Sequence, residues 1–125
     1  MAKPADAELQ KALVKMVETS KKTKLIDSQI AVLKRVVTHL DLTKGEINAL
    51  PAGTKTYESI GRMFLLTDLE EVKTNLKNRE AQLLSRRAEL EKSKQYLEKN
   101  LKESQDNIRE MVQQRKELEQ GEKPN

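Results

Sequence analysis

The sequence predicts a mostly α-helical fold, an antiparallel two-helix coiled coil with a short β-hairpin between its helices. Residues 5–44 and 62–120 contain neither glycine nor proline, whereas Gly45, Pro51, Gly53 and Gly61 interrupt the segment between them. These residue types end helices and form turns, so two long helices are expected on either side of a short non-helical middle. Of the 125 residues, 35% are charged and only 2% are aromatic, which is too few large rings for an ordinary globular core.

The first helix is expected over residues 6–40, because its apolar residues recur with the heptad spacing of a coiled coil. Two columns of residues follow this spacing and lie three positions apart, as the a and d positions of a coiled-coil seam do. Threonines within both columns make this seam weaker than a purely aliphatic one. The columns are Leu9, Met16, Thr23, Ile30 and Val37, and Ala12, Thr19, Ile26, Leu33 and Leu40.

The middle, residues 41–67, is expected to hold a short helix and then a β-hairpin. Thr43 followed by Glu46 has the spacing of a capped helix start, and Pro51 would end that helix after about one or two turns. The runs "KTYESI" and "RMFLL" around Gly61 are rich in residues that strands favour, which predicts a hairpin over residues 56–67. Two strands alone are marginally stable in water, so partners are expected to complete the sheet.

The second helix is expected over residues 68–119, followed by a flexible tail over residues 120–125. Asp68 can cap its first turn, and Glu71 can reach back three residues later as in a capping box. A column of leucines then recurs at every seventh position and is broken by one serine. This column consists of Leu69, Leu76, Leu83, Leu90, Leu97, Ser104, Met111 and Leu118.

The leucine column is predicted to pack against the first helix of its own chain. A basic-region zipper would need a continuous basic helix directly before the leucines, but residues 41–68 carry a net negative charge and contain proline and glycine. Folding back through the hairpin instead would place Leu40 near Leu69 and Ile26 near Leu83. A slip of this register by one residue is the alternative. If the predicted register holds, the other, more polar half of the seam contains Val72, Arg79, Arg86, Ser93 and Asn100.

In this register the second helix extends beyond the first from about residue 105. Its segment "DNIREMVQQRKELEQ" would leave Ile108, Met111 and Val112 poorly covered, which predicts a surface for reversible binding of other apolar chains. A frayed helix end is the alternative.

Charge and motif content exclude several classes of function. The net charge is +4, but the basic excess lies within residues 1–40, where only Lys21–Lys24 cluster, so a solvated helix face is predicted and no nucleic-acid binding. No GxxxxGK[ST] loop is present, and His39 is the single histidine, so no catalytic residue, cofactor or metal ligand is predicted and the protein is not expected to be an enzyme. There is no cysteine, no secretory signal at the start and no apolar run long enough for a membrane span. A soluble intracellular protein without membrane contact is therefore expected.

Several short segments, taken in order, resemble the β-class subunits of prefoldin. They are "ELQKAL", "KLIDSQI", "YESIGRMFLL", "YLE" and "DNIREM", which together span nearly the whole chain, whereas the polar end "ELEQGEKPN" departs from the pattern. The resemblance implies a cytoplasmic, ATP-independent co-chaperone of six subunits, of α and β class, whose hairpins join into β-barrels. It also implies that coiled-coil arms hold non-native clients such as actin and tubulin and pass them to the cytosolic group II chaperonin.

Two groups of site residues follow from the hairpin and from the free helix ends. A structural or scaffolding coiled coil is the alternative function, although a scaffold would not need strands between its helices. The residues expected to mediate assembly are Tyr57, Ile60, Gly61, Met63, Phe64 and Leu65, and the candidate client contacts are Leu9, Leu13, Met16, Ile108, Met111 and Val112.

Overall fold

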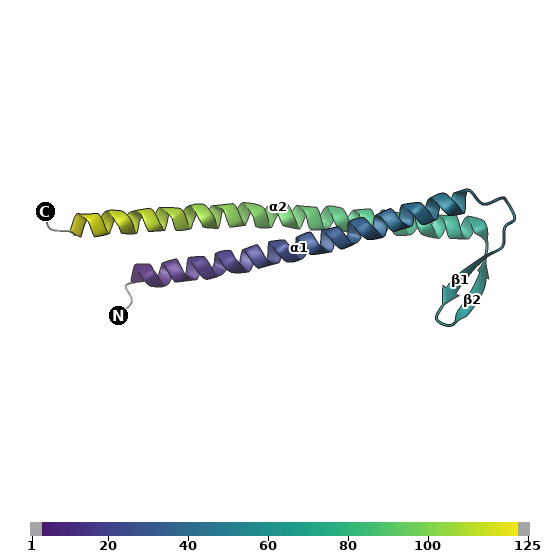
Figure 1. The fold of residues 1–125 in the computed structure, drawn as a ribbon, viewed down its shortest axis with the longest axis horizontal. Coiled ribbons are helices and arrows are strands. Elements are labelled where there is room, and N and C mark those ends of the chain that lie inside the picture. Colours follow the sequence, from purple (N-terminus) through teal and green to yellow (C-terminus); the bar gives the residue numbers. More distant parts are fainter. Residues whose placement is uncertain (1–3, 123–125) are drawn as a thin grey trace. The chain divides into compact units, whose positions relative to one another are not determined.

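The computed structural model describes residues 4–122 and consists of two long helices with a two-stranded hairpin between them (Figure 1). The order is α1 (Pro4–Asn48), β1 (Thr56–Ile60), β2 (Met63–Thr67) and α2 (Leu69–Glu122). The predicted fold class is confirmed. The chain forms two compact units: one contains residues 4–28 and 91–122, and the other, Gln29–Leu90, contains the hairpin and the adjoining halves of both helices.

Helix α1 continues through the segment where a separate short helix was expected. It begins at Pro4, whose fixed φ suits a first helical turn, and it passes residue 40 without a break to end at Asn48. The Thr43 hydroxyl donates to the His39 carbonyl oxygen at 3.0 Å, so this threonine lies inside the helix and does not cap a new one. The boundary at residue 40 was wrong because a single glycine, Gly45, lowers helix stability without ending the helix.

The hairpin covers the predicted residues 56–67, and its strands are joined by a two-residue turn at Gly61 and Arg62. Its register pairs Ile60 with Met63 across the turn and Thr56 with Thr67 at the open end. Gly61 has a φ of +61°, and no other described residue except Gly53 has a positive φ, so the turn is of type II′, with glycine at its first central position. The root of the hairpin is fixed by the Thr56 hydroxyl, which donates to the Thr67 carbonyl oxygen at 2.6 Å.

Helix α2 begins directly after Asp68, as predicted, and extends further than expected. The Val72 amide donates to the Asp68 carbonyl oxygen at 3.0 Å, which places Asp68 at the N-cap. Thr67 and Leu69, on either side of Asp68, are both buried, so the junction between hairpin and helix is held firmly. The helix continues past residue 119 to Glu122, and residues 123–125 of the expected tail lie outside the described residues.

The leucine column of α2 faces the seam, but the second seam column differs from the predicted one. Of the predicted column, Val72 and Asn100 are half-buried, but Arg79, Arg86 and Ser93 between them are exposed. The residues four positions after the leucines are half-buried instead. Both choices satisfy a heptad, and because both columns are polar over most of their length, composition could not decide between them. The half-buried column is Lys73, Glu80, Arg87, Lys94, Leu101 and Ile108.

Ion pairs between the helices show that the predicted register was wrong as well. In the unit at the free helix ends, Lys94 Nζ lies 2.7 Å from Asp27 Oδ1, and Arg115 Nη1 lies 2.7 Å from Asp6 Oδ1. Residue 27 therefore lies opposite residue 94, about three helical turns beyond the predicted position near Leu83. The physical reason is the length of α1: because it continues to Asn48, the helices pair further along α2 than a reversal at residue 40 would allow.

The pair between Lys44 and Glu80 predicts a defined pH dependence of stability. Lys44 Nζ donates to Glu80 Oε2 at 2.8 Å. This hydrogen bond lowers the pKa of Glu80 from its ordinary 4.5 and raises the pKa of Lys44 from its ordinary 10.5. The stabilisation is therefore fully present between these ordinary values. It is lost as the pH falls through the lowered pKa of Glu80 or rises through the raised pKa of Lys44.

Replacement Glu80→Gln is expected to lower the melting temperature near neutral pH, and this effect should shrink at acid pH as the parent carboxylate becomes protonated through its lowered pKa. Circular dichroism melting curves of both proteins at the two pH values measure this. Glu89→Gln, an exposed glutamate of the same helix, is the control. A difference between parent and Glu80→Gln that is the same at both pH values would contradict the prediction.

Candidate functional site: the hairpin and the free helix ends

The register of the hairpin places apolar side chains on both of its faces. Successive residues of a strand point to opposite faces, so Ile60 and Met63 share one face, whereas Tyr57, Phe64 and Leu66 share the other. All five side chains are at least half exposed, and Phe64 reaches 76%. Neither face of this sheet is therefore fully covered by residues 4–122, although a sheet normally buries at least one face.

The backbone edges of the hairpin are also available. The type II′ turn joins the Met63 amide to the Ile60 carbonyl, and hydrogen-bonded pairs alternate along an antiparallel ladder. Within β2, Met63, Leu65 and Thr67 thus use their amides inside the hairpin, whereas the amides of Phe64 and Leu66 point outward. A two-stranded sheet with free edges and bare apolar faces is suited to pairing with further strands.

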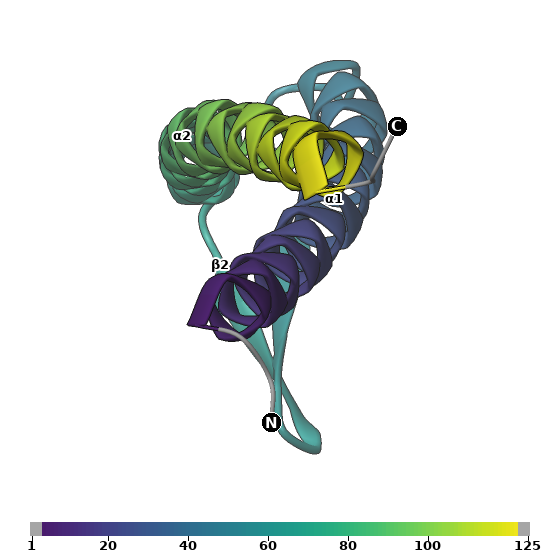
Figure 2. The same ribbon diagram turned by 90° about the vertical axis from the view of Figure 1, so that its left-hand side faces the viewer.

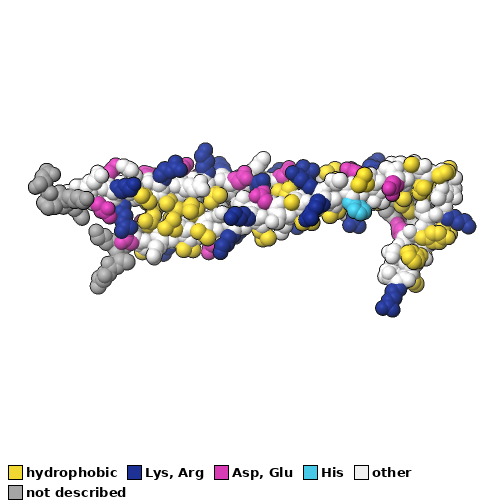
Figure 3. All heavy atoms as spheres, viewed as in Figure 1, with side chains coloured by type: hydrophobic (Ala, Val, Ile, Leu, Met, Phe, Trp, Pro, Cys, Tyr) yellow, Lys and Arg dark blue, Asp and Glu magenta, His cyan; other side chains and the backbone are white. Residues whose placement is uncertain are grey.

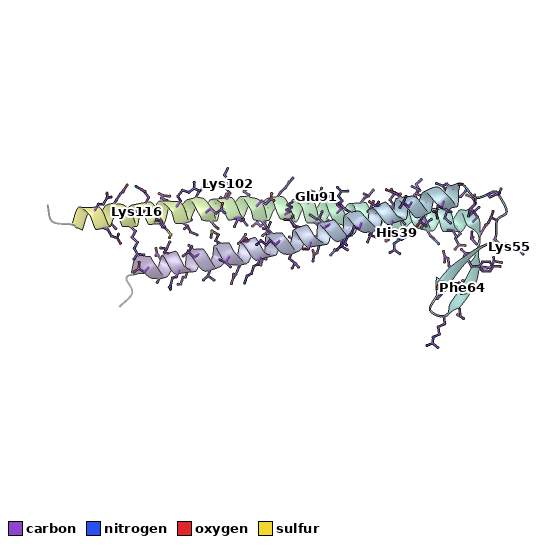
Figure 4. The ribbon with its side chains drawn as sticks, viewed as in Figure 1. His39, Lys55, Phe64, Glu91, Lys102 and Lys116 are labelled. Carbon is purple, nitrogen blue, oxygen red and sulfur yellow. The ribbon has the colours of Figure 1, made fainter. Side chains whose placement is uncertain are left out.

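Contacts with α2 fix the direction in which the hairpin projects from this helix. Asn75 Nδ2 donates to Glu58 Oε1 at 3.3 Å and links the first strand to the helix. From this contact and the buried junction at Leu69, the strands project away from the helices of their own unit in both views (Figure 1, Figure 2). Phe64 lies on the projecting part, clear of both helices (Figure 4).

The structure brings the six predicted assembly residues together in β1, β2 and their turn. Sequence reasoning missed Leu66, which is 59% exposed and pairs with Tyr57. Strand alternation could have found it, because Leu66 lies two residues from Phe64 and so shares its face.

The predicted client contacts lie near the free helix ends, but they differ in exposure. Leu9, Met16, Ile108 and Met111 are half-buried in the seam, whereas Leu13 and Val112 are exposed. The predicted overhang of Ile108 and Met111 is therefore wrong, because the corrected register covers them with α1. Sequence reasoning also missed exposed apolar side chains near the free helix ends, among them Val14, Val17 and Leu118.

Hydrophobic side chains gather along the line where the two helices of this unit meet (Figure 3). Leu13 and Val17 are one helical turn apart, so they form a continuous apolar strip beside the seam. Arg115 closes the end of this seam by pairing with Asp6. The surface can hold an apolar segment only weakly, since its most exposed members are small or isolated.

A family profile described as "Prefoldin subunit" matches residues 10–115, which is most of the chain. The chain belongs to the prefoldin subunit family. Prefoldin subunit 1 of Danio rerio is 45% identical to it over 84 residues, covering 64% of this chain and 69% of that protein. Prefoldin subunit 1 of Homo sapiens is 42% identical over 84 residues, which likewise cover 64% of this chain and 69% of that protein.

A solved prefoldin has the same fold. The prefoldin beta subunit from Thermococcus strain KS-1 superposes with a TM-score of 0.77 at 22% sequence identity, covering 82% of this chain and 90% of the other. Prefoldin subunits are chaperone components, so the chain is a prefoldin chaperone subunit. Within residues 4–122, no helix is both long and apolar enough to cross a membrane, and no three His, Cys, Asp or Glu side chains are grouped to hold a metal ion.

Proposed function

We propose that this chain is one β-class subunit of a hexameric, ATP-independent co-chaperone in the cytoplasm. Its hairpin pairs with hairpins of α- and β-class neighbours in a shared β-barrel. The free ends of its helices contact non-native proteins of the actin and tubulin class. The assembly delivers these proteins to the cytosolic group II chaperonin.

The observation that carries this proposal is the uncovered hairpin. Its apolar side chains are at least half exposed on both faces, and its outward amides have no strand to pair with among residues 4–122. Water solvates such a surface poorly, and burying each large side chain fully would stabilise an assembly by about 1.5 to 3 kcal/mol. Neighbouring strands satisfy the edges and cover the faces at the same time.

The test is the composition and mass of the native complex. The chain, carrying an affinity tag, is expected to co-purify with five further subunits of prefoldin size from cells of its own source. Native mass spectrometry should then give a hexamer of unlike chains. A homodimer as the only assembly would contradict the proposal and favour a scaffolding coiled coil.

Client contacts are proposed for the exposed strip near the free helix ends. In the triple variant Leu13→Ser, Val17→Ser and Val112→Ser, each substitution should weaken client capture by about 1 kcal/mol, because these side chains are only partly exposed. The loss should be partial, since the other subunits of a hexamer still bind. Suppression of aggregation of an unfolded protein, measured with hexamers of verified mass, gives the result.

A matched control carries three serines at exposed leucines away from the free ends. Hexamers with this control are expected to protect clients as well as the parent does. Equal protection by both variants would mean that clients bind elsewhere. The control substitutions are Leu25→Ser, Leu42→Ser and Leu84→Ser.

A further inference from the structure

A groove with an apolar floor runs beside the helix seam in the unit that contains the hairpin. Its volume is about 500 Å³, and Val36, Leu40 and Leu76 contribute aliphatic surface from both helices. Val32 extends this surface outward and is 47% exposed. The hairpin contributes no residue to the groove, which is therefore distinct from the exposed apolar residues of the hairpin.

The polar rim of the groove is basic. Arg35 and His39 from α1 and Arg79 from α2 border it, and none of the described residues that line it is acidic. His39 is labelled on the face shown in Figure 4, and the same histidine is visible at the surface in Figure 3, with hydrophobic and basic side chains among its neighbours. Both arginines are exposed, and neither forms an ion pair with a residue between 4 and 122. Arg86, one heptad beyond Arg79, is exposed as well.

A second hollow adjoins the first at Arg79. It is lined by the amide side chains of Asn75, Asn78 and Gln82 together with Leu83. Arg79 thus stands between an apolar groove and a row of amides that can donate or accept hydrogen bonds. A carboxylate of a bound segment could form a bidentate pair with the Arg79 guanidinium. Apolar side chains of the same segment could then pack on the aliphatic floor.

We propose that this groove docks an acidic amphipathic helical segment of another protein. We infer a polypeptide because the floor of the groove is aliphatic. Its side chains have helical spacing, so they can pack against the apolar face of a partner helix lying in the groove. The commitment to acidic character rests on charge complementarity with the unpaired arginines. Nucleic acid is disfavoured, because half of the lining is aliphatic and none of it is Phe, Tyr or Trp, the large rings on which bases stack most strongly.

The experiment measures binding of a fluorescein-labelled helical peptide to the full-length chain by fluorescence anisotropy. The peptide has about four turns, leucines along one face and glutamates on its flanks, and a second peptide has lysine in place of each glutamate. The parent chain is expected to bind the glutamate peptide at least about tenfold more tightly than the lysine peptide, and added salt should reduce this preference.

Variants of the chain locate the site. Arg35→Glu combined with Arg79→Glu should weaken binding of the glutamate peptide about tenfold, and the corresponding pair of glutamine substitutions should weaken it less. Lys34→Glu combined with Lys77→Glu makes the same change in net charge on the same helices but outside the groove. This control should bind like the parent, and circular dichroism should show equal helix content in all four proteins.

Four results would overturn the proposal. The first is equal binding of the glutamate peptide by the arginine variants and the parent, and the second is equal weakening of binding by the lysine control. Another is tighter binding of a single-stranded oligonucleotide that displaces the peptide, which would make the groove a nucleic-acid site. The last is self-association of the parent that the arginine variants abolish, which would make it an interface between copies of this chain. The helical surface tested excludes the hairpin, so failure here would leave the proposed assembly untouched.

Discussion

Phe64→Pro should prevent the chain from entering its hexamer while leaving the hairpin and both helices formed. The Phe64 amide points away from the hairpin ladder, so proline there removes no hydrogen bond inside the hairpin. It removes a donor for the neighbouring subunit's strand, and its ring obstructs close pairing at that edge. Co-expression with the other subunits and pull-down on one of them should recover no variant chain, and circular dichroism should remain close to that of the parent.

Two further variants separate the backbone effect from other effects of this substitution. Phe64→Val keeps the amide and a strand-favouring side chain, so it should still assemble, with reduced stability. Ile60→Pro removes an amide from the internal ladder, so it should disrupt the hairpin itself and also block assembly. Normal incorporation of Phe64→Pro would show that neighbouring strands do not pair along this edge.

Leu40→Ala should destabilise the isolated chain by about 2 kcal/mol, near the lower end of the range for leucine truncation in a protein core. Leu40 is only 7% exposed and is one of the few buried apolar residues of its unit. The effect should stay near the lower end because a seam between two helices can partly close over the missing atoms. Urea unfolding followed by circular dichroism measures the change in the free energy of unfolding.

The same substitution two residues away provides the control for Leu40→Ala. Leu42 is 68% exposed on the same helix, so Leu42→Ala should change the free energy of unfolding by less than about 0.5 kcal/mol. Equal destabilisation by the two variants would mean that Leu40 contributes helix propensity alone and that the seam does not depend on it.

The sequence was sufficient to predict the helices, the hairpin and the leucine face, because each depends on local spacing and on residues with strong preferences. The end of α1 was less predictable, since Gly45 favours a break but the helix continues to Asn48. The register depended on that end. Because the chain reverses beyond residue 40, the partner of Asp27 is Lys94. Heptad spacing cannot detect such a shift, since the same pattern of apolar residues recurs every seven positions.

The exposed apolar residues of the hairpin, for which we propose a role in assembly, could be located from the sequence because both hairpin faces are apolar in a short segment. For the proposed client contacts, the sequence indicated the region near the free helix ends but not which of its side chains are exposed. Whether Ile108 is exposed depends on how far α1 reaches along α2, and this is a property of the register. The groove beside Leu76 was not predictable, since it combines Arg35 and Arg79 from segments that lie far apart in the sequence.

The charged seam column of α2 affects which helices can pair with it. This column contains Lys73, Glu80, Arg87 and Lys94. If two α2 helices zipped together in parallel through their leucines, each of these residues would face its own copy. Like charges would then oppose each other at four successive levels, so such a dimer is penalised repeatedly along its length. Pairing with α1 instead gives Glu80 and Lys94 partners of opposite charge. In the hexamer of unlike subunits proposed above, this column would therefore disfavour a parallel homodimer held by the leucines of two identical chains.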